Sequence, residues 1–393
     1  MGYFDNAAIN FDVLKKRAFN YRWAEVPDGV IPLTAADPDF PAHPAVREAI
    51  INYAKEGYFS YTPHRGMPDF MESISKALKL RKNEDVPPEL ILPIDSAARG
   101  MYVIAQTVLQ PGDEMIVFDP VDFLFRQSCL SAGATPVLFP ARLDGDHIDL
   151  SELERYITPK AKMIGLCNPH NPLGALYTRE DLEHILSLAE KYDLYIMNDE
   201  IWSDIVYPPK KFISILELGA QRNRKTLSVF GWSKSFCVAG LRIGCVYGQD
   251  KELFDKVIDK SAVMTTAGGI SSLSQIAGKT CVDQCYGWLD EFLLHLKGNR
   301  DYAVERINAM PGLRARKADA TYLLFFDITQ TGKDSQTFVD ELLQQQKLAL
   351  TPGSAKFFGP GAEGRVRLCY ATSREVLKEG LDRLEAYTKS ISK

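Results

Sequence analysis

Short apolar runs alternate with amphipathic stretches through the middle of the chain. Runs of four to six residues are typical of strands that are buried on both faces of a parallel sheet. Residues 178–192 instead have helical spacing, with Thr178 placed to cap the helix and Asp181 three residues further on. This alternation predicts an α/β domain with a mostly parallel sheet. The expected strands are 114–118, 136–139, 163–167, 194–198, 227–230 and 243–248.

The pattern changes toward the C terminus. A helix, a strand at 321–328, a second helix, a strand at 366–371 and a closing helix follow in order, which predicts a smaller α+β domain. The N-terminal segment is rich in proline and predicts an extended arm that packs on other parts of the chain. We therefore expect a large domain over 46–288 and a second unit, arm plus small domain, formed by 1–45 and 289–393.

Composition excludes several classes of protein. The 393 residues are 46% hydrophobic, and the 46 basic and 51 acidic residues are mixed, so no basic stripe is present for nucleic acid. No apolar run has the length of a signal peptide or a membrane span. The seven cysteines lack a C-x-x-C pair, and the six histidines lack metal spacing. We expect a cytoplasmic protein that works on small molecules, without metal, nucleic acid or membrane partners.

A candidate reactive lysine follows the expected strand at 227–230. Ser233 and Lys234 come directly after that run, and Arg242 lies eight residues beyond the lysine. A lysine beside a buried strand is desolvated, which favours the neutral amine that attacks an aldehyde. A serine and an arginine can bind a phosphate. The stretch by itself is more typical of a surface loop with a solvated lysine and arginine.

Three other polar motifs stand at strand ends. Asp199 follows a strand where open α/β sheets bind ligands, and it could pair with a protonated pyridine nitrogen. The turn at 168–174 is rigid, with Pro172 a candidate for a cis bond, and it fixes Asn171 to donate to a phenolic oxygen. Residues 95–100 open a helix whose first amides suit a phosphate. Read singly, these are a helix cap, a turn and a capped helix.

The motifs occur in the order of a known family. The chain resembles the pyridoxal 5'-phosphate (PLP) dependent aminotransferases of class I and II, the fold type I group, from about Pro32 to Arg383. The motifs N-P-x-N-P-x-G, D-E and S-K-x-x-x-x-x-G-x-R span 75 residues from Asn168 to Arg242. This resemblance implies a fold type I PLP-transferase with a large α/β domain, a smaller α+β domain and PLP as cofactor.

The resemblance also implies roles for individual residues. Lys234 would hold PLP as a Schiff base and remove the substrate Cα proton, Asp199 would pair with the pyridine nitrogen, and Asn171 would bind the phenolic oxygen. Arg367 would bind the substrate α-carboxylate, because a guanidinium fork matches a planar anion. Ala36 and Asn171 would line the substrate site. The positions implied to hold the cofactor phosphate are Ser96, Ala97, Ala98, Ser233 and Arg242.

Some positions depend on a second subunit or depart from the family pattern. Tyr61 matches a tyrosine that reaches the phosphate in the other subunit, which implies a homodimer with shared sites. Trp202 replaces the usual tyrosine after D-E, and we expect it to contact the cofactor through its indole N–H. Asp122 stands where an aromatic side chain normally stacks on the ring, and we expect the neighbouring Phe123 to stack instead.

These departures resemble a sister group, the PLP-dependent C–S β-lyases of the cystathionine β-lyase type. Their A-D-x-D-F motif matches 36–40, and their D-E-I-H-x-D motif matches 199–204 except at Trp202. The lyases usually lack the arginine of G-L-R, so Arg242 favours the transaminases. We predict an aminotransferase that moves an amino group between an amino acid and a 2-keto acid, with a C–S β-lyase as the alternative. A third hypothesis, a cofactor-binding regulatory protein, would need a DNA-binding domain before the resemblance begins.

Overall fold

The computed structural model describes residues 2–392, which fold into alternating helices and strands. The helices are α1 (Phe11–Arg17), α2 (Pro44–Lys55), α3 (Pro68–Lys82), α4 (Ala97–Val108), α5 (Phe123–Ser131), α6 (Arg179–Lys191), α7 (Lys251–Ser261), α8 (Ser272–Gln284), α9 (Tyr286–Asn308), α10 (Ser335–Gln346) and α11 (Arg374–Ile391). The strands are β1 (Ile31–Pro32), β2 (Ile91–Ile94), β3 (Glu114–Asp119), β4 (Thr135–Pro140), β5 (Leu143–Asp144), β6 (His147–Ile148), β7 (Ala161–Cys167), β8 (Tyr195–Asp199), β9 (Thr226–Gly231), β10 (Gly244–Gly248), β11 (Leu323–Asp327), β12 (Leu348–Ala349), β13 (Thr351–Pro352) and β14 (Arg365–Cys369).

The large domain is built on one seven-stranded sheet in the order β2-β10-β9-β8-β7-β3-β4. The pairs from β9 through β4 are parallel, whereas β10 runs antiparallel to both of its neighbours. The predicted α/β domain with a mostly parallel sheet is therefore confirmed. The apolar run at 243–248 gave no sign that its strand is reversed, because a strand buried on both faces reads the same in either direction.

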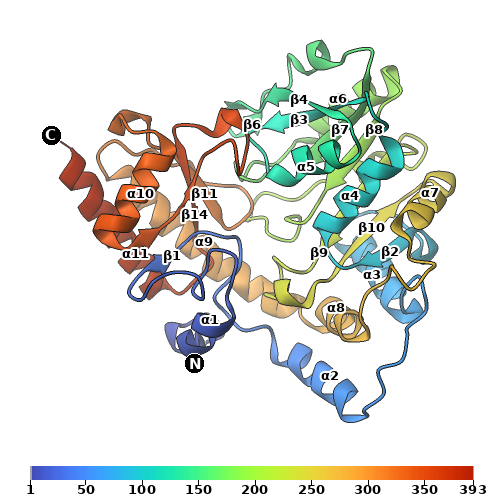
Figure 1. Ribbon diagram of the computed structural model, residues 1–393, viewed down its shortest axis with the longest axis horizontal. Helices are drawn as coiled ribbons and strands as arrows, with labels where there is room; N and C mark the ends of the chain where they lie inside the picture. Colours follow the sequence, from blue (N-terminus) through green and yellow to red (C-terminus); the bar gives the residue numbers. More distant parts are fainter. Residues whose placement is uncertain (1, 393) are drawn as a thin grey trace.

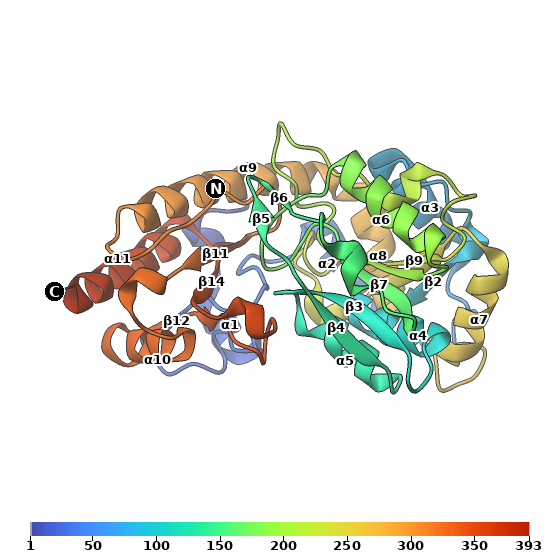
Figure 2. The ribbon, with the colours of Figure 1, turned by 90° about the horizontal axis from the view of Figure 1, so that it is seen from above.

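Helices cover both faces of this sheet (Figures 1 and 2). α4, α5 and α7 pack together on one face, where α4 contacts β8, β9 and β10. α3 and α8 pack against each other on the other side, next to β2. The capping box predicted for the helix after Thr178 is present, since the Thr178 and Asp181 side chains and backbones bond reciprocally. The strands are thus buried between two layers of helices, as their uninterrupted apolar runs predict.

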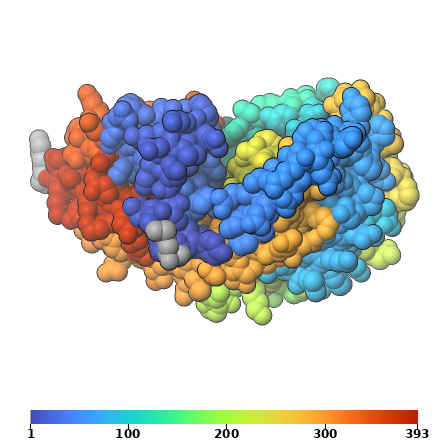
Figure 3. Space-filling view, turned by 90° about the horizontal axis from the view of Figure 1, so that it is seen from below, coloured from blue at the N-terminus to red at the C-terminus, as the bar shows by residue number. Residues whose placement is uncertain are grey.

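The small domain holds a three-stranded antiparallel sheet, β11-β14-β13, packed with α9, α10 and α11. The N-terminal arm joins it through β1, which pairs in parallel with β12. The arm is extended in part, but the short helix α1 interrupts it. Figure 3 shows the blue N-terminal residues lying over the orange and red C-terminal part. The boundary expected at residue 288 falls within α9, one continuous helix that runs from the large domain to the small one (Figure 2).

Candidate active site

The C-terminal ends of several parallel strands meet at one edge of the large sheet. β3, β7, β8 and β9 run in the same direction, so the segments that follow them lie side by side. β2 also runs this way, because it and β9 are both antiparallel to β10, and it brings the start of α4 to the same edge. This edge faces the small domain, whose β14 carries Arg367 (Figure 1). The predicted site residues that these segments carry are Ser96, Ala97, Ala98, Asn171, Asp199, Ser233 and Lys234.

Lys234 is held at this edge by contacts with the N-terminal arm and with Trp202. Its Nζ donates a hydrogen bond of 2.6 Å to the Ala36 carbonyl and lies 5.8 Å from the centre of the Trp202 ring. Burial lowers the pKa of the Lys234 amine, and the nearby Arg367 lowers it further, although Asp37 and Asp122 oppose this shift. Lys234 forms no ion pair with any residue in the range 2–392. This environment favours the neutral, nucleophilic amine.

The segment that carries Ala36 is fixed by a buried ion pair in the arm. Arg22 is 1% exposed and its Nη2 lies 2.5 Å from Asp39 Oδ1, while its Nη1 donates to the Pro32 carbonyl at 2.7 Å. Trp23 Nε1 donates to the same Asp39 oxygen at 2.7 Å. A buried pair with these extra hydrogen bonds leaves the segment one orientation. The Ala36 carbonyl therefore points at Lys234 from a fixed place.

Asp199 is a buried carboxylate at the end of β8. It is 6% exposed, and its Oδ1 accepts a hydrogen bond of 3.0 Å from the backbone N–H of Ile201. Burial raises its pKa to about 7, against the effect of that hydrogen bond, and the carboxylates of Asp122 and Glu200 add to the rise. In the part of the chain that the structure describes, no cation pairs with it. Asp199 is thus a buried acid that lacks a cationic partner.

Asn171 and Arg367 are brought together although 196 positions separate them in the sequence. Arg367 Nη1 donates to Asn171 Oδ1 at 3.3 Å, and its Nη2 donates to the Thr34 carbonyl at 3.4 Å. Asn171 Nδ2 donates in turn to Asp122 Oδ2 at 2.9 Å. The peptide bond before Pro172 is cis, as the turn suggested. Arg367 is 8% exposed, its guanidinium carbon lies 4.9 Å from the centre of the Phe358 ring, and its buried Nε has no hydrogen-bond partner among residues 2–392.

The start of α4, where we predicted phosphate-binding residues, lies next to β10. Ser96 caps the helix by accepting from the backbone N–H of Arg99 at 3.1 Å. A Cβ at Gly244 would lie 2.7 Å from the backbone nitrogen of Ala97, so only glycine lets β10 approach this closely. Arg242 is exposed in the loop before β10, and no acidic residue between positions 2 and 392 pairs with it. These groups offer amide donors and a free cation to an anion.

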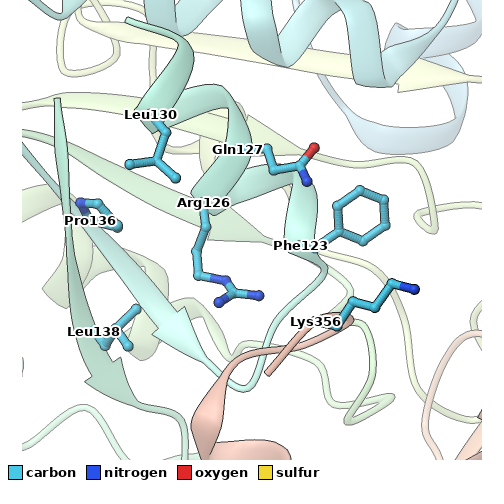
Figure 4. Close-up of a pocket in the computed structure, with 7 residues that line it drawn as sticks. All are labelled: Phe123, Arg126, Gln127, Leu130, Pro136, Leu138 and Lys356. Carbon is cyan, nitrogen blue, oxygen red and sulfur yellow. The ribbon is translucent and has the colours of Figure 1, made fainter. Parts of the chain in front are cut away.

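Phe123 and Tyr61 lie away from these contacts. Phe123 lines a pocket of about 300 Å³ beside α5 and β4, next to Arg126 and Lys356 (Figure 4). It is Asp122, one residue earlier, whose side chain reaches Asn171. Tyr61 is 92% exposed on the loop after α2. Stacking by Phe123 and a contact from Tyr61 to a second subunit remain predictions.

The structure adds residues that the motifs did not single out. Tyr322 donates to the Ala36 carbonyl at 3.2 Å and packs edge-on against Trp202, with ring centres 4.7 Å apart. Trp202 itself is 1% exposed. Asp122 belongs to this group because it bonds to Asn171. The signal for Asp122 was a family position filled by an unexpected residue type, whereas Tyr322 gave no signal beyond its place in an expected strand.

Two absences bear on the kind of site. Within residues 2–392, no group of three or more histidine, cysteine, aspartate or glutamate side chains is placed to hold a metal ion. Over the same span, no helix combines the length and the apolar character that crossing a membrane requires.

Comparison with known proteins gives one consistent result. The family described as aminotransferase class I and II matches residues 28–384. An aspartate aminotransferase from Thermotoga maritima is 32% identical over 366 residues, which cover 92% of each chain. The crystal structure of an aromatic aminotransferase from Pyrococcus horikoshii OT3 is similar with a TM-score of 0.86 and 27% identity, over 93% of this chain and 97% of that one.

A second solved structure shares the fold at lower identity. Cystalysin from Treponema denticola, which contains a pyridoxal 5'-phosphate cofactor, is similar over the whole length of both chains, with a TM-score of 0.91. Its sequence identity is 22%, so it supports the fold and not the activity.

Proposed function

Because the chain belongs to the class I and II aminotransferase family, we propose that it moves an amino group from an α-amino acid to a 2-oxo acid with PLP bound at Lys234. The predicted fold type, family, cofactor and aminotransferase activity are confirmed by the match over residues 28–384 and by the relatives. The observation that carries the assignment to this site is the meeting of Lys234, Asp199, Asn171 and Arg367 at one sheet edge.

The residues at the edge fit PLP. Asp199 is a buried carboxylate without an ion pair in residues 2–392, which suits a protonated pyridine nitrogen. The first amides of α4, Ser233 and the free Arg242 suit the phosphate. Trp202 lies beside Lys234 and is proposed to contact the cofactor. When bound, PLP supplies an electron sink that stabilises negative charge at the substrate Cα.

The side chains of this protein then have separate tasks. The Lys234 amine, whose pKa burial lowers, would remove the Cα proton as a general base and return a proton to the product. With PLP bound, Asp199 would pair with the protonated pyridine nitrogen, and Asn171 would donate to the phenolic oxygen. Arg367 binds the α-carboxylate and orients the Cα–H bond toward Lys234. The Ala36 carbonyl, which now accepts from Lys234, lines the substrate site.

The proposal includes a second subunit. Tyr58, Phe59 and Tyr61 are 79%, 60% and 92% exposed on one loop, where apolar surface is uncovered. Such a cluster fits an interface between copies of the chain. We include in the proposal a homodimer in which Tyr61 completes the other site, stacking of Phe123 on the cofactor, and a cytoplasmic location.

The activity is tested with the purified, PLP-loaded protein and a panel of amino donors, aspartate first, because the relatives include aspartate aminotransferases. Each donor is paired with 2-oxoglutarate and with pyruvate. Transamination predicts parallel lines in double-reciprocal plots of initial rate, as expected when one product leaves before the second substrate binds. It also predicts release of the 2-oxo acid without ammonia. Intersecting lines together with ammonia release would contradict the proposal.

A C–S β-lyase remains the second candidate, favoured by the arm that places Ala36 against Lys234 and by the motif at 199–204. Both reactions begin with removal of the Cα proton, and they differ in what leaves next. A lyase would form pyruvate and ammonia from cystathionine with no oxo-acid acceptor present. Sustained pyruvate formation under that condition would select the lyase.

A further inference from the structure

Asp122 stands where the family places an aromatic ring, and its carboxylate is fixed in the site. Its Oδ1 accepts from the backbone N–H of Leu124 at 3.1 Å, at the start of α5. Its Oδ2 accepts from Asn171 Nδ2 at 2.9 Å, and its own backbone N–H donates to the Asn171 carbonyl at 3.2 Å. These three bonds set the orientation of Asp122 within the protein itself.

Asn171 connects Asp122 to Arg367 in a way that the charges dictate. Its Oδ1 faces the Arg367 guanidinium and its Nδ2 faces the Asp122 carboxylate, which is the one amide orientation that satisfies both groups. Arg367 has no carboxylate in direct contact within residues 2–392, and its buried Nε has no partner. The negative charge of Asp122 therefore offsets the positive charge of Arg367 through the Asn171 amide that lies between them. The guanidinium can still form a direct contact with another anion.

A carboxylate bound to Arg367 would be a second anion beside one guanidinium. The other ionisable groups around Asp122 are Lys234 after β9, Asp199 at the end of β8 and Cys167 at the end of β7. Burial raises the pKa of the Cys167 thiol and keeps it uncharged. Two carboxylates that share one site rarely stay ionised together, and one of them takes a proton.

Asp122 is the carboxylate more easily protonated. Burial raises its pKa, although the Leu124 N–H and the Arg367 and Lys234 cations oppose the rise. The incoming carboxylate would contact Arg367 directly, which stabilises its ionised form more than a bridged contact does. The proton would therefore go to Asp122.

On the premise of the proposed function, that Arg367 binds the substrate carboxylate, we propose that Asp122 takes up a proton from water as that carboxylate binds. The Asp122 carboxylate becomes a neutral carboxylic acid, and no bond in the substrate changes. Asp122 is thus a positioning residue, which orients Asn171 and Arg367 in the empty site and does not repel the anion in the occupied one. In the pH range where Asp122 is ionised in the empty site and protonated in the occupied site, the affinity for the carboxylate should therefore fall about tenfold for each unit that the pH rises.

Asp122→Asn removes the charge and nearly preserves the size of the side chain. Asparagine has one side-chain oxygen, so it keeps either the cap on α5 or the hydrogen bond from Asn171, and it binds no proton in this pH range. A matched control is Asp334→Asn, because Asp334 caps α10 in the same manner and its carboxylate accepts only from Thr337 in the structure as described. Both variants change a capping aspartate to asparagine, and one of the two lies in the site.

The test is calorimetric titration of the PLP-loaded protein with propionate, a carboxylate that has no amino group to react. Titrations in two buffers of different ionisation enthalpy give the number of protons taken up per ligand bound. The change in the visible absorption band of the cofactor gives the part of that number that protonates the Schiff base. After that subtraction, wild type and Asp334→Asn should take up protons, at most one per site, at pH values where Asp122 is ionised in the empty site, and Asp122→Asn should take up none. Asp122→Asn should also bind propionate more tightly at alkaline pH, with a flat pH profile.

Equal proton uptake by wild type and Asp122→Asn, or no uptake by wild type, would overturn the inference. Failure of the underlying function would appear differently, in Arg367→Gln. If that variant binds propionate as tightly as wild type, Arg367 does not bind the carboxylate, and the role that the proposed function gives to Arg367 is wrong. If Arg367→Gln loses binding while Asp122→Asn retains proton uptake, only the inference about Asp122 fails.

Discussion

Two buried lysines of this protein have opposite environments. Lys82, at the end of α3, has its Nζ 3.0 Å from Glu200 Oε2 and 3.7 Å from the centre of the Phe230 ring. Burial alone would lower the pKa of Lys82, but Glu200 and, more weakly, Glu84 raise it above its usual range. Lys234 donates to a backbone carbonyl instead, and its pKa is lowered. A direct carboxylate contact therefore separates a structural cation from a reactive amine.

The carboxylates near the two lysines, Glu200 beside Lys82 and Asp199 at the sheet edge with Lys234, also have opposite environments. Glu200 accepts from Lys82, Tyr247, Asn198 and Ser214, so its bonding capacity is filled by the protein. Its neighbour Asp199 accepts one backbone bond and pairs with no cation in residues 2–392. The two adjacent acids thus have different surroundings. Glu200 faces the buried group formed by Lys82, Tyr247, Asn198 and Ser214, and Asp199 faces the sheet edge.

The largest expected effect separates the two lysines by activity. Lys234→Ala should lower kcat by at least about 10⁴-fold, because it removes both the cofactor attachment and the general base. The free energy of unfolding should stay close to wild type, since Lys234 makes no ion pair in the described chain. Steady-state rates and urea unfolding test this on the same preparation. A Lys234→Ala protein with kcat within a factor of about ten of wild type would contradict the assignment.

Lys82→Met should have the reverse profile. It leaves the Glu200 carboxylate buried without its cation, which we expect to lower the free energy of unfolding by about 3–5 kcal/mol. The folded fraction should keep its kcat. The double variant Lys82→Met with Glu200→Gln removes both charges and should recover part of the loss. A stability loss equal in the single and double variants would show that the charge pair is not the cause.

The pH dependence of stability sharpens the contrast between Asp199 and Glu200. The pKa of Asp199 is raised to about 7 in the folded, cofactor-free protein, so between its unfolded value and 7 the folded state alone holds the proton. The stability contribution of Asp199 should therefore fall as pH rises from 4 to 7, by roughly 4 kcal/mol in all. Asp199→Asn should abolish that slope, measured by urea unfolding at a series of pH values. Persistence of the slope in the variant would assign it to another group.

The smallest effect is expected at an exposed lysine. Lys191 lies 2.5 Å from Glu154 at the surface and is 61% exposed. Solvent screens such a pair, so Lys191→Met should leave both kcat and the unfolding midpoint unchanged within error. This variant is the matched surface control for Lys82→Met. A loss as large as that of the buried lysine would mean that burial does not distinguish the two pairs.

Local patterns predicted the elements of the large domain well. The apolar runs gave its strands, and Thr178 gave the start of α6, because burial on both faces and capping depend on neighbouring residues. The direction of β10 depends on its partners β2 and β9, which the run at 243–248 does not encode. The position of a helix or strand is thus easier to predict from sequence than the strands with which it pairs and their direction.

The site was predictable where motifs carried it. Lys234, Asp199 and Asn171 were named from strand ends and from family order. The contacts of Asp122 and Tyr322 were not, because tertiary packing makes them: Asn171 meets Arg367 across 196 positions, and Tyr322 meets Ala36 across 286. The role proposed for Tyr61 requires a second copy of the chain, which one sequence does not describe.

On the proposed function, Lys234, and not Lys82, holds the cofactor. Borohydride reduction of the PLP-loaded protein fixes a Schiff base as a stable secondary amine, and peptide mass spectrometry then locates the modified lysine. We expect the pyridoxyl group on Lys234, with Lys82 unmodified. Modification of Lys82 or another lysine in place of Lys234 would contradict it.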